Sequence, residues 1–267
     1  MIACISQVTT LNAPFADDMA AATGAGFAAL EVWFTKLEQH IESGGVDSTA
    51  KLLADSGLTL AAASLQGGLL VGGADRRTVH LDHFKRRLDL CQRLGIPVVV
   101  LSPGLARGAA ESLDAAMKHL VEAARWAAAF GVKLALEFHG SDAFCNNLDT
   151  ALNVIERCSE PNLGICLDAF HFHTGPSKTE DLARLAPGNL FHVQMCDASG
   201  PAREMLTDSD RVLPGDGDIT LTPIVERLKA IGYAGAVSVE LMNPVLWNVP
   251  AAQLADAARR SLERFGV

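Results

Sequence analysis

The sequence predicts a single (β/α)8 barrel over residues 1–267, and two observations support this fold. The length of 267 residues is close to the roughly 250 residues typical of such barrels. Short runs of Val, Leu and Ile also alternate with Ala-rich helical stretches from one end of the chain to the other, without a linker or low-complexity segment. This alternation is typical of parallel strands that are buried on both faces and connected by helices.

Eight strands and eight helices can be placed on this pattern. The strands are expected at Ile2–Val8, Ala29–Phe34, Thr59–Ser64, Pro97–Leu101, Lys133–Phe138, Leu163–Asp168, Phe191–Cys196 and Ala236–Leu241. The helices are expected at 15–25, 47–56, 78–94, 111–130, 148–158, 179–186, 222–231 and 251–265. A doubly wound open sheet is the alternative fold, but it usually has a Gly-rich turn after its first strand. Residues 7–12 contain no glycine, which favours the barrel.

Composition excludes several classes of protein. The formal net charge of -9 argues against a nucleic-acid partner, because such partners bind basic surfaces. The basic residues from Arg76 to Arg87 lie on a predicted helix with Asp82 and Asp89, and they indicate a solvated helix face. The first ten residues do not resemble a signal peptide, and no apolar segment is long enough to span a membrane. The six cysteines lack C-x-x-C spacing, which fits free thiols in a reducing cytoplasm.

Polar side chains stand at or near the carboxyl ends of the last four expected strands, where barrel enzymes carry out their chemistry. These side chains belong to Glu137, Asp168, Gln194 and Glu240. Converging carboxylates in an apolar setting are costly unless they are paired or bound to a metal. Oxygen ligands of this kind suit a hard divalent cation such as Mg²⁺ or Mn²⁺. The alternative is that each acid is neutralised by its own Arg or Lys from a neighbouring loop.

Five segments resemble the xylose-isomerase-like barrel superfamily, the sugar phosphate isomerase/epimerase group. They are LALEFHG (134–140), GICLDAFHFH (164–173), FHVQMCDA (191–198), RVLPGDGDI (211–219) and GYAGAVSVEL (232–241). The resemblance implies one divalent ion (Mn, Mg, Co or Zn) held by Glu137, Asp168, Gln194 and Glu240. It also implies a small sugar or polyol substrate, and it leaves a homo-oligomer open.

Position 194 distinguishes branches of this superfamily. Many sugar epimerases carry His there, whereas Gln194 followed by Met-Cys-Asp-Ala is similar to the 3-dehydroshikimate dehydratases. His192 lies two residues earlier on the same strand face and is an alternative ligand. Those dehydratases typically have an Arg after strand three that holds the substrate carboxylate, where this chain has Leu65-Gln66-Gly67-Gly68. This difference favours an uncharged sugar or polyol, with Gln66 among the substrate contacts.

The chemistry implied by the resemblance is proton transfer alpha to a carbonyl. In a metal-dependent isomerase or epimerase, Glu137 and Glu240 would act on opposite faces of a ketose or related polyol. In the alternative, a dehydratase of dehydroshikimate or a keto-inositol, His171 would be the base. A DNA-repair endonuclease of the apurinic-site type is disfavoured because the acidic balance would repel DNA. A sugar-binding barrel without catalysis also stays open.

Three further residues are expected to contact the substrate. His139 has the same inward parity as Glu137 and is placed near substrate hydroxyls. Trp33 ends the second expected strand and could form an apolar wall for a sugar ring. In the family, the loop that Arg211 opens covers the active site. Arg211 is expected either to bind a substrate oxygen or to tether Glu240.

Overall fold

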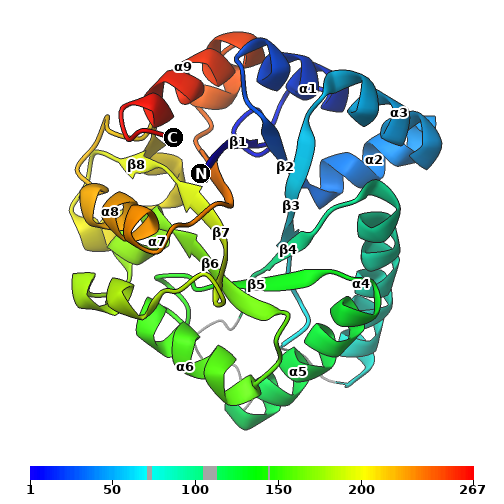
Figure 1. Ribbon diagram of the computed structural model, residues 1–267, viewed down its shortest axis with the longest axis vertical. Coiled ribbons are helices and arrows are strands. Elements are labelled where there is room, and N and C mark those ends of the chain that lie inside the picture. Colours follow the sequence, from blue (N-terminus) through cyan, green and yellow to red (C-terminus); the bar gives the residue numbers. More distant parts are fainter. Residues whose placement is uncertain (71–73, 105–112, 144) are drawn as a thin grey trace.

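A closed barrel of eight parallel strands forms the centre of the computed structural model, which describes residues 1–70, 74–104, 113–143 and 145–267. The strands follow the order β1-β10-β7-β6-β5-β4-β3-β2 around the barrel. Helices surround them on the outside (Figure 1). This arrangement confirms the predicted (β/α)8 barrel.

The strand bounds agree with the sequence pattern to within two residues. They are β1 (Ile2–Ser6), β2 (Ala29–Trp33), β3 (Thr59–Gln66), β4 (Val98–Leu101), β5 (Lys133–Glu137), β6 (Leu163–Asp168), β7 (Leu190–Met195) and β10 (Ala236–Val239). Because β-strand side chains alternate between faces, the inward face can be followed along each strand. Ala135 precedes Glu137 on this face of β5, and Cys166 precedes Asp168 on β6. On these two strands a small side chain therefore lies below the acid that stands at the carboxyl end of the barrel.

Nine α-helices are found in the described residues. They are α1 (Phe15–Gly24), α2 (Phe34–Gly44), α3 (Val46–Ser56), α4 (Ala74–Leu94), α5 (Leu113–Ala129), α6 (Leu148–Cys158), α7 (Ala169–Thr174), α8 (Thr222–Ala230) and α9 (Ala251–Glu263). The expected helix at 179–186 is instead a short 3-10 helix, η1 (Thr179–Arg184). None of these helices combines the length and apolar character needed to cross a membrane.

Two of the helices, α2 and α7, were not expected from the sequence. Each begins at the residue that directly follows a strand, so no Gly or Pro marks the boundary. At α7 the helix N-cap is Asp168, whose Oδ1 accepts hydrogen bonds from the backbone N–H groups of Phe170 (2.6 Å) and His171 (3.4 Å). The same acid that ends β6 therefore fixes the helix that carries His171.

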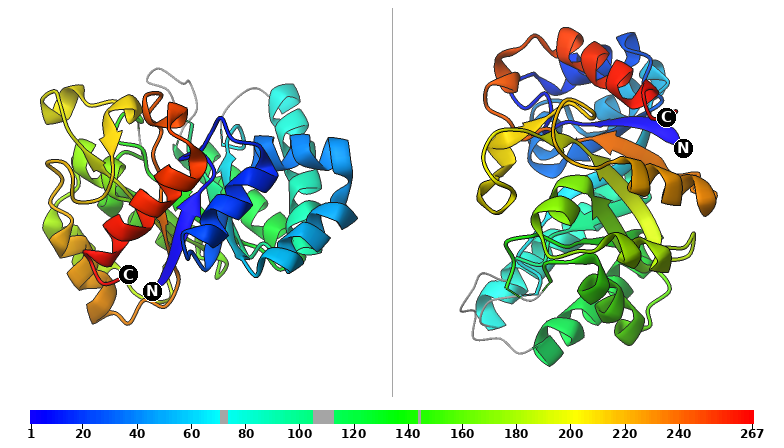
Figure 2. Two further views of the ribbon diagram at one scale, coloured as in Figure 1. Left: turned by 90° about the horizontal axis from the view of Figure 1, so that it is seen from above. Right: turned by 90° about the vertical axis from the view of Figure 1, so that its left-hand side faces the viewer.

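A small two-stranded sheet extends above the barrel and was also not expected. It pairs β8 (Asp197–Ala198) with β9 (Arg211–Val212) in antiparallel fashion, so that Ala198 lies opposite Arg211. Short 3-10 helices, η2 (Arg203–Met205) and η3 (Asp208–Asp210), lie between these strands in the sequence. Figure 2 (left) shows this segment in yellow, at the end of the barrel away from the N-terminus. The pairing brings Arg211 over the carboxyl ends of the barrel strands.

The basic cluster on α4 is only partly the solvated face that its composition indicates. Arg87 is buried, and its Nε and Nη2 donate to the two carboxylate oxygens of Glu38 at 2.8 Å each. Its guanidinium lies over the ring of Phe34, 4.4 Å from the centroid. The expectation is therefore wrong for Arg87, because an acid and an aromatic ring on α2 together accommodate its charge.

Candidate active site and metal centre

Three of the predicted acids converge at the carboxyl end of the barrel. Glu137 ends β5, Asp168 ends β6 and Glu240 directly follows β10. All three are buried, with exposed fractions of 2%, 0% and 2%. One carboxylate oxygen from each lies within 4.8 Å of those from the other two. We call these three residues the acid cluster.

Arg211 supplies one positive charge to the acid cluster. Its Nη1 lies 2.8 Å from Asp168 Oδ2 and 3.3 Å from Glu240 Oε2, and its guanidinium is 1% exposed. No Arg or Lys pairs with Glu137 among the described residues. With all three acids ionised, the three carboxylates and one guanidinium carry a formal charge of about -2, which a divalent cation would neutralise. The alternative in which every acid has its own cationic side chain is thus not what the geometry shows.

Two buried oxygens of the acid cluster fit a role as metal ligands. Glu137 Oε2 and Asp168 Oδ2 have no hydrogen-bond partner among the described residues. A buried carboxylate oxygen without a hydrogen bond costs free energy unless a charge compensates it. Arg211 Nη1 faces Asp168 Oδ2, and His139 Nε2 faces Glu137 Oε2. The chemistry of these donors, three carboxylates and no thiol, suits a hard or borderline divalent ion.

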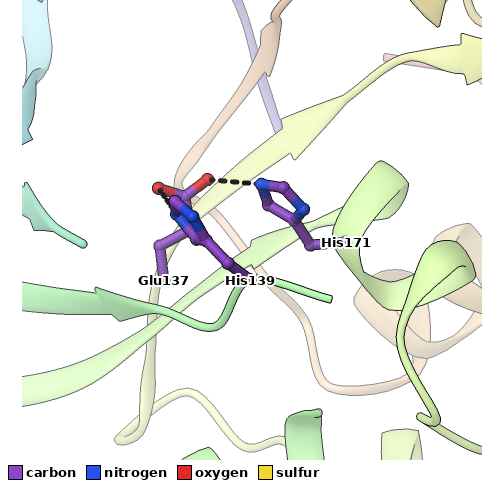
Figure 3. Close-up of side chains that lie close together, drawn as sticks. All are labelled: Glu137, His139 and His171. Atoms are coloured by element: carbon purple, nitrogen blue, oxygen red, sulfur yellow. Dashed lines mark ion pairs between the residues drawn. The ribbon is translucent and has the colours of Figure 1, made fainter. Parts of the chain in front are cut away.

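Two histidines stand beside Glu137 and point toward it (Figure 3). His139 Nε2 lies 3.1 Å from Glu137 Oε2, and His171 Nε2 lies 3.8 Å from Glu137 Oε1. The two imidazole rings stack with centroids 4.3 Å apart. These three residues form a second group that could hold a metal ion, and it shares Glu137 with the acid cluster. The structure therefore brings both predicted histidines to the predicted acids.

The acid cluster is electrostatically uneven. Burial raises the pKa of Glu240 well above its ordinary value, and three neighbouring carboxylates add to this increase against the opposing Arg211. Burial also acts to raise the pKa of Asp168, but Arg211 and His171 outweigh it and the pKa is lowered. The surroundings therefore favour the neutral form of Glu240 and the ionised form of Asp168. A bound cation would favour the ionised form of Glu240, so metal affinity should increase with pH.

The pKa values of the two histidines shift in opposite directions. Burial acts to lower the pKa of both side chains. For His139, the adjacent Glu137 carboxylate outweighs burial, and the pKa is raised. For His171, the charges of Arg211 and His139 reinforce burial against the opposing carboxylates, and the pKa is lowered. His171 is therefore a neutral imidazole that can accept a proton.

The predicted fourth ligand, Gln194, contacts the acid cluster through its amide nitrogen. Nε2 donates to Glu240 Oε1 at 2.8 Å and to Glu31 Oε1 at 2.9 Å. Its Oε1 accepts a hydrogen bond from Cys166 Sγ at 3.0 Å. The alternative ligand His192 lies deeper in the barrel, where Nε2 is 2.9 Å from Glu31 Oε2. His192 makes no contact with the acid cluster among the described residues. Gln194 contacts it through N–H and not through its carbonyl oxygen, so the role of Gln194 as a ligand stays a prediction.

Known proteins resemble this chain over nearly its whole length. Residues 19–265 match the xylose isomerase-like TIM barrel family. The chain belongs to this family. A crystal structure of IOLI protein with a binding zinc atom superposes with a TM-score of 0.92 at 26% identity, covering 99% of this chain and 98% of that one.

Curated relatives within the xylose isomerase-like family include two activities. An inosose isomerase of Halalkalibacterium halodurans is 34% identical over 183 residues, which are 67% of this chain and 65% of that protein. A 3-dehydroshikimate dehydratase of Pseudomonas aeruginosa is 27% identical over 255 residues, covering 95% of this chain but 40% of that protein. The chain thus spans less than two thirds of the length of either relative.

Two predicted substrate contacts of this family member lie away from the acid cluster. Gln66 is buried, and its Oε1 accepts a hydrogen bond from Arg87 Nη1 at 3.1 Å. Trp33 is half-buried, and its backbone N–H donates to Gln7 Oε1 at 3.0 Å. Neither side chain contacts the acid cluster among the described residues, so both substrate roles stay predictions.

A cleft of about 640 Å³ opens beside His171. Phe170 and Asp208 also line this cleft, and both contact Arg211. Asp208 Oδ1 lies 2.9 Å from Arg211 Nη2, and the Arg211 guanidinium lies 4.4 Å from the Phe170 ring centroid. Arg211 also contacts Glu240, as expected if it tethers that carboxylate. The alternative, that Arg211 binds a substrate oxygen, stays a prediction. The cleft gives a small molecule access to the neutral imidazole.

Asp197 organises the loop above the site, a role that the sequence analysis missed. Its Oδ1 accepts hydrogen bonds from the backbone N–H groups of Ala198 and Ile219, both at 2.8 Å, and its Oδ2 accepts one from Gly215 at 3.1 Å. A Cβ atom at Gly217 would collide with Asp197 Oδ1 and with the Ala198 carbonyl oxygen, so this position requires glycine. One buried carboxylate therefore holds together the β8 strand and the loop that follows β9.

We expect Asp197→Asn to lower the free energy of unfolding by about 2–3 kcal/mol, because an amide cannot accept all three hydrogen bonds and its NH₂ would face backbone donors. Urea unfolding monitored by circular dichroism measures this change. Asp216→Asn is the matched control, since Asp216 pairs with Arg264 at the exposed surface and should contribute less than about 1 kcal/mol. Equal destabilisation by the two substitutions would contradict the role given to Asp197.

Proposed function

We propose that this chain is a divalent-metal-dependent isomerase or epimerase that transfers a proton alpha to the carbonyl of a ketose or related polyol. The observation that carries the proposal is the acid cluster, in which three buried carboxyl groups converge and only one guanidinium lies among them. The similarity to an inosose isomerase supports a polyhydroxylated carbonyl substrate. The acidic character of the chain is consistent with a small-molecule substrate rather than DNA.

Glu137, Asp168 and Glu240 would hold the ion, with Gln194 as the fourth residue of the site. The ion is Mn, Mg, Co or Zn, and when bound it polarises the carbonyl and stabilises the charge that develops as the proton leaves. Asp168 is suited to a purely ligating role, because its other oxygen caps α7. Glu137 and Glu240 lie on either side of it, and are the candidates for proton transfer.

Glu240 is the candidate proton donor and Glu137 the candidate proton acceptor. Glu240 is the acid whose pKa is raised well above its ordinary value by burial and neighbouring carboxylates. Glu137 has an oxygen without a hydrogen bond in a buried site, so it can accept a proton from a substrate carbon. His139 and Arg211 would orient the substrate oxygens from opposite ends of the acid cluster.

A proton-exchange assay tests this function. The protein is incubated with Mn²⁺ in D₂O with a panel of inososes and ketohexoses, and the products are followed by NMR and mass spectrometry. We expect deuterium at a carbon alpha to the carbonyl of an otherwise intact sugar, with an isomer accumulating. Absence of both exchange and turnover over the whole panel, in protein shown to contain Mn²⁺, would overturn the proposal.

A dehydratase of the same fold is the second candidate, and two observations favour it. His171 is a neutral imidazole at the edge of the cleft, where it can act as a general base. The match to a 3-dehydroshikimate dehydratase also extends over 95% of this chain. The same assay distinguishes the two reactions, because elimination produces a net loss of water and a conjugated product with new ultraviolet absorbance. His171→Asn would abolish elimination while leaving exchange by Glu137 measurable.

A further inference from the structure

A chain of buried hydrogen-bonding groups runs through the barrel interior below the acid cluster. His192 Nε2 lies 2.9 Å from Glu31 Oε2, Glu31 Oε1 accepts from Gln194 Nε2 at 2.9 Å, and Gln194 Nε2 donates again to Glu240 Oε1 at 2.8 Å. All four residues are at most 2% exposed. The chain connects strand β2, through β7, to the residue that follows β10.

Glu31 is a fully buried acid that does not belong to the acid cluster. No Arg or Lys pairs with it among the described residues, and its ion-pair partner there is His192. Burial of such a carboxylate costs several kcal/mol unless its oxygens are satisfied. Both oxygens are in fact used, one by His192 and one by Gln194. These two contacts therefore hold the Glu31 carboxylate in place from both sides.

The Glu31 carboxylate in turn fixes the orientation of the Gln194 amide. The amide nitrogen lies between carboxylate oxygens of Glu31 and Glu240, with one N–H available for each. Rotating the amide by half a turn would place its carbonyl oxygen against both carboxylates, which repel it. The Cys166 thiol occupies the opposite side, where it donates to Oε1. Without Glu31, one of the three interactions that select this orientation is lost.

We propose that Glu31 is the positioning residue of the metal centre, acting through Gln194 to hold Glu240 in place for the ion. Gln194 restrains Oε1 of Glu240, which leaves Oε2 directed to Arg211 and to the rest of the acid cluster. This inference rests on the proposed function, because it requires that the acid cluster binds a divalent ion. Partners outside the ligand shell typically change metal affinity by about 10- to 100-fold.

A double-mutant cycle on Mn²⁺ affinity tests the inference. Free Mn²⁺ is measured by electron paramagnetic resonance for the wild type, Glu31→Gln, Gln194→Leu and the double variant. We expect Glu31→Gln to weaken Mn²⁺ binding by about 10- to 100-fold. We expect it to have little further effect in the Gln194→Leu background, because Glu31 acts through that amide. A merely structural role would lower the melting temperature and give additive effects.

Asp18→Asn is the matched control. Asp18 is another buried acid, it pairs with Lys36 at 2.6 Å, and it lies outside the chain of groups below the acid cluster. Its neutralisation should change the melting temperature while leaving the Mn²⁺ affinity within about threefold of wild type, because it contacts no residue of the metal centre. If Asp18→Asn weakens Mn²⁺ binding as much as Glu31→Gln does, then neutralising any buried acid has this effect. That result would overturn the inference.

Other outcomes separate this inference from the proposed function. Wild-type protein that binds no Mn²⁺ would overturn both, whereas wild type and Glu31→Gln that bind Mn²⁺ equally well would overturn only the role of Glu31. If Glu31→Gln does not fold, His192→Asn replaces it in the cycle, because it removes the group that holds Glu31. Unchanged or additive affinity in that second cycle would likewise contradict the proposal.

Discussion

Glu137→Gln should lower kcat/KM by at least about 10³-fold. The substitution removes one of the three charges that attract the cation, and it also removes the proposed proton acceptor, whose loss alone typically costs about 10²- to 10⁴-fold. The side-chain volume is nearly unchanged, so the fold should tolerate it. Steady-state kinetics on the substrate identified by proton exchange, at saturating Mn²⁺, provides the measurement.

Glu226→Gln is the control for this experiment, because Glu226 lies on the exposed surface of α8 and makes no contact with the acid cluster. Its kcat/KM should remain within about twofold of wild type, as for most surface substitutions. A Glu137→Gln variant that keeps more than about a tenth of wild-type activity would exclude Glu137 as the proton acceptor, since even modest base catalysis exceeds this factor.

Arg211→Met should lower the free energy of unfolding of the metal-free protein by about 3–5 kcal/mol. This is the usual cost of removing one partner from a buried ion pair, and here the guanidinium serves both Asp168 and Glu240. Saturating Mn²⁺ should restore part of the loss, because the ion neutralises the same carboxylates. Urea unfolding in EDTA and in excess Mn²⁺ measures both effects.

Arg264→Met is the corresponding control. Arg264 pairs with Asp216 at the exposed surface, so its loss should cost less than about 1 kcal/mol and should not respond to Mn²⁺. If Arg211→Met in EDTA is as stable as Arg264→Met, the buried carboxylates are neutralised in some other way, and the charge count at the site is wrong.

The barrel and its acids could be predicted because their signals are local. Each strand is a short aliphatic run, and side-chain alternation within a run determines which residues face inward. Glu137 and Asp168 end such runs, and every parallel strand of a barrel ends on the same face. The convergence of the acids therefore follows from the fold alone, before any distance is known.

The contacts that complete the site could not be predicted, because they join residues far apart in sequence. Glu31 and His192 are separated by 161 positions, and nothing in either strand indicates the other. Arg211 reaches Asp168 because β9 pairs with β8, and a strand of two residues leaves no periodic signal. Helix α2 was missed for a different reason. Trp33 belongs to β2 and is also the N-cap of α2, so no turn residue separates strand from helix.

The proposed function requires one cation among the carboxylates of the acid cluster, and anomalous diffraction from crystals grown with Mn²⁺ detects such an ion. We predict one strong anomalous peak within about 2.0–2.3 Å of a carboxylate oxygen of each of Glu137, Asp168 and Glu240. A cluster that contains no anomalous peak at saturating Mn²⁺, with Arg211 as its only positive charge, would contradict the account.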